Sequence, residues 1–148
     1  RSELIGFFEE HHPDSITAQD IRYWQRKGYI NYNGFAKDVR PFLGQADCLV
    51  FPSFYPEGIP RCLMEAASME IPIITSLNRG CKEVVEENVN GFLCAMNDAD
   101  DLARKMENMI ALSPARRSAM GKKGRELVIG KFDVQKILLE YDRALNHV

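Results

Sequence analysis

The sequence predicts an α/β fold in which a doubly wound parallel sheet is covered by helices on both faces. Short apolar runs alternate along the chain with longer segments of helical periodicity, and this alternation is typical of parallel sheets. With 148 residues, the chain has the size of one domain with its own core. It shows no internal repeat, low-complexity stretch or linker.

Strands are expected where apolar runs rich in β-branched and aromatic residues stand between turn residues. Two of these runs, 47–51 and 72–75, should form adjacent parallel strands, because a right-handed crossover through the helix between them joins neighbouring strands. The expected strands lie at residues 4–7, 29–33, 48–51, 72–75 and 92–95.

Capping residues mark where the helices begin. Thr17 stands three residues before Asp20, as in a capping box, where each side chain binds the other's backbone N–H. Asp98 and Ser113 are further N-cap candidates, and Pro60 suits a first helical turn because it has no N–H to leave unpaired. Helices are expected over residues 17–27, 39–45 and 81–87, and from residues 60, 98, 113 and 134.

Two of the later helices carry an apolar stripe with the spacing of one helical face. Such a stripe predicts an amphipathic helix with one apolar face. In the helix after Asp98 the stripe consists of Leu102, Met106, Met109 and Ile110, and in the last helix of Val134, Ile137, Leu138, Tyr141 and Leu145.

The composition is that of an ordinary globular chain, with 45% apolar and 27% charged residues. The formal net charge of −2 gives no broad positive surface, so we expect no nucleic-acid partner. A small basic cluster at Lys122, Lys123 and Arg125 is interpreted as a solvated helix face. No apolar run approaches the ~20 residues of a membrane span, and no signal peptide is visible.

No metal site is expected. His11 and His12 are adjacent in a loop without a third ligand nearby. The four cysteines lie far apart and lack the spacing of metal-ligand pairs, so we interpret them as reduced thiols of a cytoplasmic protein. They are Cys48, Cys62, Cys81 and Cys94.

Two glutamates eight positions apart flank a helix start directly after the 48–51 run. Glu57 stands on a loop at the carboxyl end of a strand, where open α/β sheets bind ligands. Gly58 lets the backbone approach a ligand, and the following helix N-terminus suits a phosphate. Because helical side chains lean toward the N-terminus, Glu65 can reach back to the same ligand. From the spacing alone, residues 56–60 could equally form an ordinary loop, and Glu65 could be a solvated residue on the surface of the helix.

This segment resembles the E-x(7)-E signature of family-4 retaining glycosyltransferases of the GT-B fold. The resemblance continues through residues 71–75, 80–85 and 90–94. Upstream, residues 32–34 and 38–41 are similar to the subgroup that builds bacterial capsule, O-antigen and lipid-linked oligosaccharides. The matching signature positions are Glu57, Gly58, Pro60, Leu63, Glu65 and Ala66.

The resemblance implies roles for both glutamates. Glu57 corresponds to the catalytic-region carboxylate near the donor sugar. Glu65 corresponds to the carboxylate that accepts hydrogen bonds from the two ribose hydroxyls. Whether Glu57 acts as a nucleophile or as an electrostatic and positioning group stays open.

The other implied donor contacts each have a structural alternative. Gly58 and Ile59 would offer backbone amides to the sugar or diphosphate, although a glycine needed only for the turn fits equally. Arg61 would meet donor phosphate or acceptor, or extend along a helix face. Gly34 and Phe35 correspond to the seat of the nucleobase, but a tight turn also explains Gly34.

Residues 1–148 are therefore interpreted as a Rossmann-like donor-binding domain, the C-terminal half of a GT-B glycosyltransferase. The resemblance implies a preceding strand with a basic pyrophosphate loop, and an N-terminal acceptor domain, which we expect to be missing from this fragment. We accordingly expect these 148 residues alone to be inactive in transfer and to bind UDP weakly.

The implied reaction transfers a sugar from a nucleoside-diphosphate donor, expected to be UDP-linked, with retention and without a metal or cofactor. The acceptor would be a lipid-linked or oligosaccharide molecule, and the intact enzyme would be cytoplasmic, with peripheral association at the inner membrane face. Two alternatives remain: an epimerase like that of UDP-N-acetylglucosamine, and a non-catalytic flavodoxin-like binding module.

Three positions depart from the family pattern. Glu70 stands where the family usually has Gly, so it should adopt a strained left-handed backbone or end the helix differently. Pro56 replaces a residue that is often basic, and Ser76 stands where many members have Asp. Polar contacts made from these two loops are therefore expected to differ.

Overall fold

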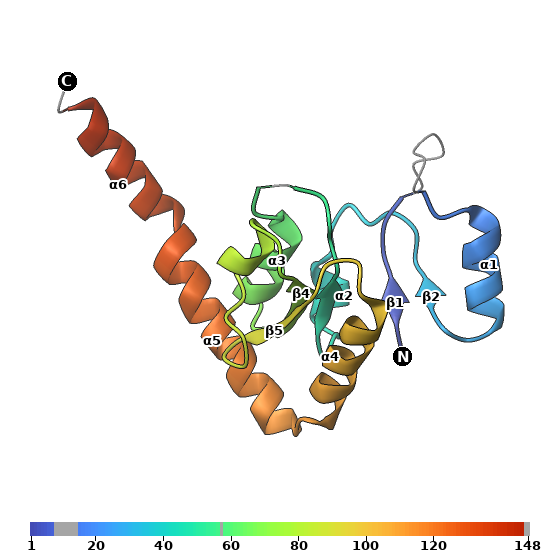
Figure 1. The fold of residues 1–148 in the computed structure, drawn as a ribbon. Helices are drawn as coiled ribbons and strands as arrows, with labels where there is room; N and C mark the ends of the chain where they lie inside the picture. The colour runs from blue at the N-terminus through green and yellow to red at the C-terminus, as the bar shows by residue number, and fades with distance from the viewer. Residues whose placement is uncertain (8–14, 57, 147–148) are drawn as a thin grey trace. The chain divides into compact units, whose positions relative to one another are not determined.

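The structure, a computed structural model, describes residues 1–7, 15–56 and 58–146 (Figure 1). The chain divides into two compact units, Arg1–Val39 and Arg40–Val148. Each unit has its own parallel sheet, two-stranded in the first and three-stranded in the second.

The first unit combines a helix with the two-stranded sheet. The predicted capping box is confirmed: Asp20 N–H donates to the Thr17 hydroxyl at 3.2 Å, and Thr17 N–H donates to the Asp20 carboxylate at 3.1 Å. The strands are shorter than the expected 4–7 and 29–33, although backbone hydrogen bonds continue as far as Gly6. The elements are β1 (Glu3–Leu4), α1 (Ala18–Arg26) and β2 (Asn31–Tyr32).

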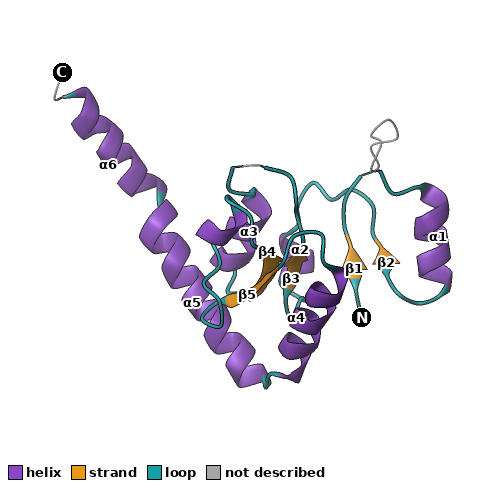
Figure 2. Cartoon of the chain, in the orientation of Figure 1, coloured by secondary structure: helices purple, strands orange, loops and turns teal. Residues whose placement is uncertain are grey.

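The sheet of the second unit has the order β3-β4-β5, and both pairings are parallel (Figure 2). Val50 stands opposite Ile74, and Phe51 opposite Thr75, so the prediction that these two runs are parallel neighbours is confirmed. All four residues of the central strand are buried. The strands are β3 (Leu49–Phe51), β4 (Ile73–Ser76) and β5 (Gly91–Cys94).

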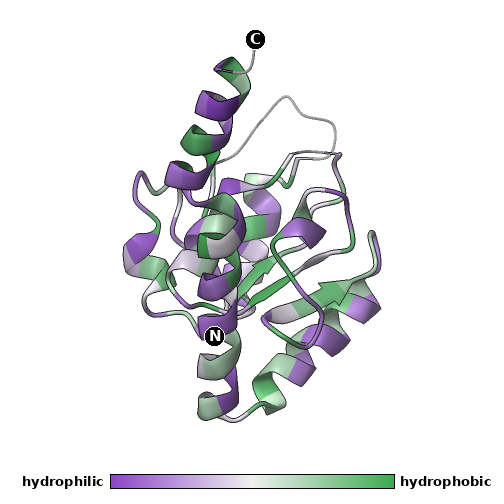
Figure 3. Ribbon diagram, turned by 90° about the vertical axis from the view of Figure 1, so that its left-hand side faces the viewer, coloured by the Kyte–Doolittle hydropathy of each residue, from purple (hydrophilic) through white to green (hydrophobic). Residues whose placement is uncertain are grey.

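Helices cover both faces of this sheet. On one face, Ile74 and Phe92 form a buried cluster with Met109 of α4 and Met120 of α5, and Figure 3 shows the strands as a hydrophobic centre between helices. On the other, α3 contacts β3 and β4. The helical elements are α2 (Arg40–Leu43), α3 (Arg61–Ser68), η1 (Cys81–Glu83), α4 (Ala99–Ala111), α5 (Pro114–Phe132) and α6 (Val134–Leu145).

The helix expected over residues 81–87 is only the single turn of η1. The side chain of Asn90 explains where it stops. Its Nδ2 donates to the Val84 carbonyl at 2.8 Å, and its Oδ1 accepts from Glu86 N–H at 2.6 Å. Because this amide, which is 1% exposed, replaces the next helical hydrogen bonds, the chain turns into β5 instead.

The two apolar stripes have different outcomes. In α4, Met109 is buried and Leu102 and Met106 pack against the core, but Ile110 is 75% exposed, so the core covers only part of this apolar face. In α6 all five stripe residues are at least 40% exposed, and Figure 1 shows this helix leaving the sheet beyond α5. The amphipathic pattern therefore predicted the helix but not a buried face.

The end of α3 confirms the expected left-handed backbone at Glu70, whose φ is 60°. Glu70 N–H donates to the Ala67 carbonyl and Ile71 N–H to the Ala66 carbonyl, both at 3.0 Å. This pair of bonds is a Schellman motif, in which the residue after the C-cap is left-handed and is usually Gly.

Replacing Glu70 by Gly should stabilise the chain. A left-handed backbone costs a non-Gly residue about 1–2 kcal/mol, and the greater freedom of Gly when unfolded offsets part of that gain, so we expect about 0.5–1 kcal/mol in the free energy of unfolding. Urea unfolding measures it. Glu70→Ala is the control, because it removes the carboxylate but keeps the Cβ, and a Gly variant no more stable than the Ala variant would contradict the strain.

Helix α5 crosses this end of α3 at very close range. A Cβ placed on Gly121 would lie 1.8 Å from the carbonyl oxygen of Glu70. One turn further, Gly124 faces Ala67 and Asn90 at ordinary contact distances, and Arg125 donates a hydrogen bond to the Ser68 carbonyl. The basic cluster interpreted as solvated therefore includes one residue that ties α5 to α3.

Candidate functional site

The loop that leaves β3 leads into α3 through Pro60. Pro60 is the N-cap, with φ −63° and ψ 127° and no side-chain cap, so its placement inside the first helical turn was wrong by one residue. Leu63 N–H donates to the Pro60 carbonyl at 3.1 Å, which makes Arg61 the first helical residue. The N-terminus of α3 thus opens at the carboxyl edge of the sheet, as the sequence predicted.

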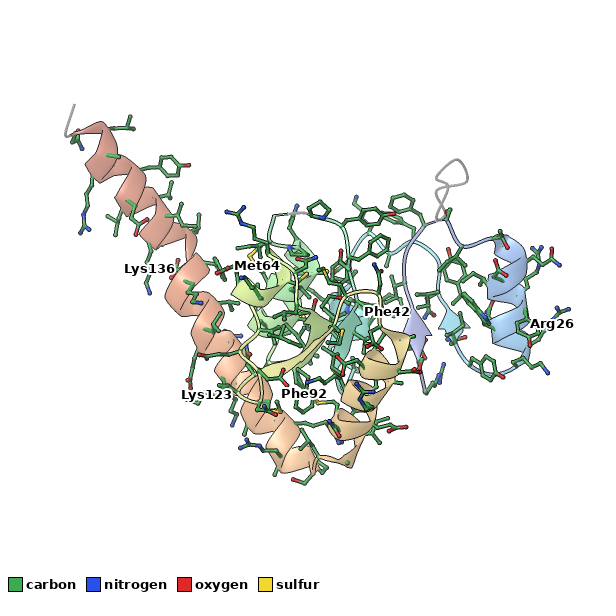
Figure 4. The ribbon with its side chains drawn as sticks, in the orientation of Figure 1. Arg26, Phe42, Met64, Phe92, Lys123 and Lys136 are labelled. Carbon is green, nitrogen blue, oxygen red and sulfur yellow. The ribbon has the colours of Figure 1, made fainter. Side chains whose placement is uncertain are left out.

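Glu65 lines an open hollow on α3 with a volume of about 290 Å³. Arg61 stands one turn before it on the same helix face, and Arg40 of α2 lines the same hollow. The opposite face of α3 is fixed in the core, because Leu63 and Ala66 are 0% exposed. The hollow therefore combines one half-buried carboxylate with two guanidinium groups, that of Arg61 on α3 and that of Arg40 on α2. Apolar side chains complete it: Met64, labelled in Figure 4, and Met69, with Ser68 beside them.

The other predicted site residues are not all placed with this hollow. Glu57 lies outside the described residues. Gly58 is exposed and Ile59 half-buried in the loop before α3. Gly34 and Phe35 belong to the first unit, where Gly34 has a φ of 70° and the Phe35 ring is 69% exposed. The left-handed backbone shows that Gly34 meets the needs of a turn.

A second hollow, of about 300 Å³, lies where β4 and β5 end. Three of its polar groups already have partners. Asp98 accepts from Asp101 N–H and caps α4, and the Cys94 thiol donates to the hydroxyl of Ser76, which is 1% exposed, at 3.9 Å. The remaining lining residues are Pro52, Ala95, Asn97, Ala99 and Leu102. The sequence analysis named four of these lining residues, none of them as a site residue: Ser76, Cys94, Asp98 and Leu102.

Two thiols near the sheet, the half-buried Cys48 and the buried Cys94, are not reactive. Burial raises the pKa of Cys48 to about 12 and also raises the pKa of Cys94. Both stay protonated at neutral pH, so neither is a nucleophile. None of the four cysteines, all of them among the described residues, forms a disulfide.

The most connected polar side chain at the carboxyl edge is one that sequence reasoning missed. Asn78 follows β4 and is 7% exposed. Its Nδ2 donates to the carbonyls of Ser53 and Tyr55, at 3.2 and 3.0 Å. Its Oδ1 accepts from the N–H groups of Gly80 and Cys81. The order Asn-x-Gly is typical of such a turn, so the turn could have been predicted from the sequence. Nothing in the sequence indicates the contacts of Asn78 to residues 53 and 55.

Over residues 1–7, 15–56 and 58–146, no group of three or more His, Cys, Asp or Glu side chains could hold a metal ion. His11 and His12 lie outside these ranges. Within the same ranges, no helix is long and apolar enough to span a membrane.

Residues 24–127 match the family described as "Glycosyl transferases group 1". The chain is 25% identical over 142 residues to the lipopolysaccharide core biosynthesis glycosyltransferase LpsE of Rhizobium meliloti. This match covers 96% of this chain and 40% of that protein. It is 30% identical over 143 residues to the capsular polysaccharide biosynthesis glycosyltransferase CapM of Staphylococcus aureus, covering 97% and 37%. The chain thus spans about 40% of the length of these relatives.

The fold is similar to that of Anabaena Alr3699/HepE, whose crystal structure is a complex with UDP. The TM-score is 0.87 at 22% sequence identity, and the match covers 99% of this chain and 40% of that one. At this identity the likeness shows the fold alone, and it confirms the expected α/β architecture of the C-terminal half of a GT-B protein. Since the family match extends over residues 24–127, well beyond half of the sequence, this chain belongs to the group 1 glycosyl transferases.

Proposed function

We propose that these residues form the nucleotide-sugar donor-binding domain of a bacterial glycosyltransferase that takes part in making a surface polysaccharide. The observation that carries the proposal is the hollow on α3, where Glu65 lies beside Arg61 and Arg40. A carboxylate and a guanidinium group on α3, with a second guanidinium group on α2, fit the two polar parts of a nucleoside diphosphate: the ribose diol and the phosphates.

The proposed contacts follow from this chemistry. Glu65 accepts hydrogen bonds from both ribose hydroxyls, and Arg61 faces the diphosphate together with the backbone amides of Gly58 and Ile59. The N-terminus of α3 adds a positive dipole end, which stabilises the charge of a departing diphosphate without a metal. The nucleobase contact proposed for Gly34 and Phe35 rests on the resemblance to the family alone.

We further propose that the donor is UDP-linked and that transfer proceeds with retention, as the family-4 signature implies. HepE, which shares the fold, was crystallised with UDP, and LpsE and CapM are named for lipopolysaccharide and capsule synthesis. These names support a lipid-linked or oligosaccharide acceptor, bound by a part of the enzyme outside this chain. Glu57 then stands next to the donor sugar, no cofactor takes part, and the intact enzyme works in the cytoplasm at the membrane face.

The first test is UDP binding to the 148-residue chain. We expect a dissociation constant weaker than about 0.1 mM, because the chain supplies only part of the donor site, and no sugar transfer. Calorimetry with UDP and UDP-sugars measures the affinity, with CDP as the control for the base. Sugar transfer by this chain alone would contradict the proposal that the acceptor is bound elsewhere.

Product analysis with a labelled nucleotide sugar separates the possible functions of the whole enzyme. Transfer to an acceptor supports the proposal, an epimerised donor would support the epimerase, and binding without turnover would support a binding module. The anomeric configuration of the transferred sugar, read by NMR, tests retention.

A further inference from the structure

The loop that leaves β3 is held by side chains where the backbone ladder ends. The last register pair of the two strands is Phe51 opposite Thr75. There the Thr75 hydroxyl donates to the Phe51 carbonyl at 2.7 Å. Asn78 then takes the next two alternate carbonyls, those of Ser53 and Tyr55. Three alternate carbonyls of the loop thus accept hydrogen bonds from two side chains on the β4 side.

The amide of Asn78 uses its full hydrogen-bonding capacity in these contacts. Both N–H groups donate to the loop, and Oδ1 accepts from the N–H groups of Gly80 and Cys81 at 3.1 and 3.3 Å. One side chain therefore fixes two segments at once: the loop after β3 and the turn that leads into η1. Since Asn78 is 7% exposed, water replaces these contacts poorly when the amide is removed.

The same loop carries an ordered aromatic pair. The rings of Phe54 and Tyr55 stack with centroids 4.3 Å apart, and each residue is 43% exposed. The carbonyls of Ser53 and Tyr55 are turned to Asn78, so the backbone between them has one defined course. Along the sequence, Gly58 follows Tyr55 by three positions, and the chain then continues through Ile59 and Pro60 into α3.

We propose that Asn78 is a positioning residue of the transfer reaction, which acts by holding the Ser53–Tyr55 backbone and thereby the stretch that presents Gly58 and Ile59 to the donor. The inference rests on the proposed function. Glu65 is held differently, by the buried face of α3 that contains Leu63. Loss of the Asn78 contacts should therefore affect the transfer step more than the binding of the nucleoside end.

The test compares Asn78→Asp with a matched variant, Asn90→Asp. Asn78→Asp keeps the oxygen that accepts from Gly80 and Cys81 but places a second oxygen against the Ser53 and Tyr55 carbonyls. Asn90→Asp makes the same change in another buried amide, whose donor contact is the Val84 carbonyl and whose turn lies outside the α3 hollow. Asn78→Ser removes the donors without adding a charge and serves if the Asp variant does not fold.

In the whole enzyme, Asn78→Asp and Asn78→Ser should lower kcat by about 10- to 100-fold, as expected for small misplacements of reacting groups. The dissociation constant of uridine, the nucleoside end of the donor without its diphosphate, should change by less than about threefold, which is under half of the 1.4 kcal/mol that a tenfold change represents. Asn90→Asp should lower the melting temperature but leave kcat unchanged. If both Asn78 variants keep kcat, or if Asn90→Asp lowers it equally, the positioning role is wrong.

A second readout uses the 148-residue chain and needs no enzymatic activity. Amide hydrogen exchange at residues 53–55, which carry the backbone N–H groups between the two prolines, should accelerate about 10- to 30-fold in the Asn78 variants, because the two hydrogen bonds that fix this backbone are lost, and not in Asn90→Asp. Unchanged exchange would overturn the inference directly. A different result would count against the proposed function: exchange accelerates in the Asn78 variants as expected, but the wild-type whole enzyme transfers no sugar. The positioning role would then be wrong as well, because it rests on that function.

Discussion

Glu65→Gln in the whole enzyme is expected to weaken UDP binding by about 10- to 150-fold. A charged hydrogen bond contributes roughly 1.5–3 kcal/mol, and this carboxylate would accept from the ribose in the ground state and the transition state alike. The substitution keeps the shape of the side chain, removes the charge and replaces one acceptor oxygen by an NH2 donor. Since α3 is anchored by buried Ala66 and Leu63, its fold should be unchanged. Calorimetry with UDP measures the loss.

Glu57→Gln is the matched comparison, because it makes the same chemical change at the other end of the signature. Its carboxylate is proposed to face the sugar, so UDP affinity should stay nearly constant while kcat falls, which is the behaviour of an interaction made mainly in the transition state. If Glu57→Gln abolished UDP binding and Glu65→Gln kept it, the two roles would be reversed.

Gly121→Ala is expected to cost about 3 kcal/mol or more of unfolding free energy, at or above the usual range for overpacking. The new Cβ would lie 1.8 Å from the Glu70 carbonyl oxygen, and a backbone atom cannot move aside as a flexible side chain does. Helix α5 must shift away from α3, which also loosens the buried packing of Met120. Denaturant unfolding, with the slope checked for constancy, gives the change.

The same helix supplies the control. A Cβ placed on Gly130 would have no other atom within 4 Å, so Gly130→Ala should raise stability by up to about 1 kcal/mol through helix propensity alone. Gly124→Ala, with neighbours at 3.6 Å, should be tolerated. Equal effects of Gly121→Ala and Gly130→Ala would show that α5 does not pack on α3 as described.

Local signals in the sequence predicted the local features of the fold. The Thr17 and Asp20 pair forms the expected capping box, because both partners lie within one helical turn. Arg61 and Glu65, which the sequence analysis named as separate candidate donor contacts, stand one helical turn apart on α3 and line the same hollow. The parallel pairing of β3 with β4 could be predicted because a right-handed crossover through one helix joins neighbouring parallel strands.

What the sequence did not predict depends on contacts between distant positions. Asn78 binds carbonyls 25 and 23 residues away, and no spacing rule connects them. Arg40 joins the hollow of Glu65 through the packing of α2. The exposure of Ile110 was not predictable either, because the period of the apolar residues shows which helix face is apolar but not how much of that face the core covers.

The exposed stripe of α6 has a thermodynamic consequence. The helix has 12 residues and no buried one, so tertiary packing contributes little to its formation, and helices of this length are marginal in water from propensity alone. It therefore forms and melts as a local equilibrium of its own, held at its start by the Asp133 cap. Substitutions within α6 change this local equilibrium, whereas substitutions in the core change the cooperative unfolding of the β3–β5 sheet.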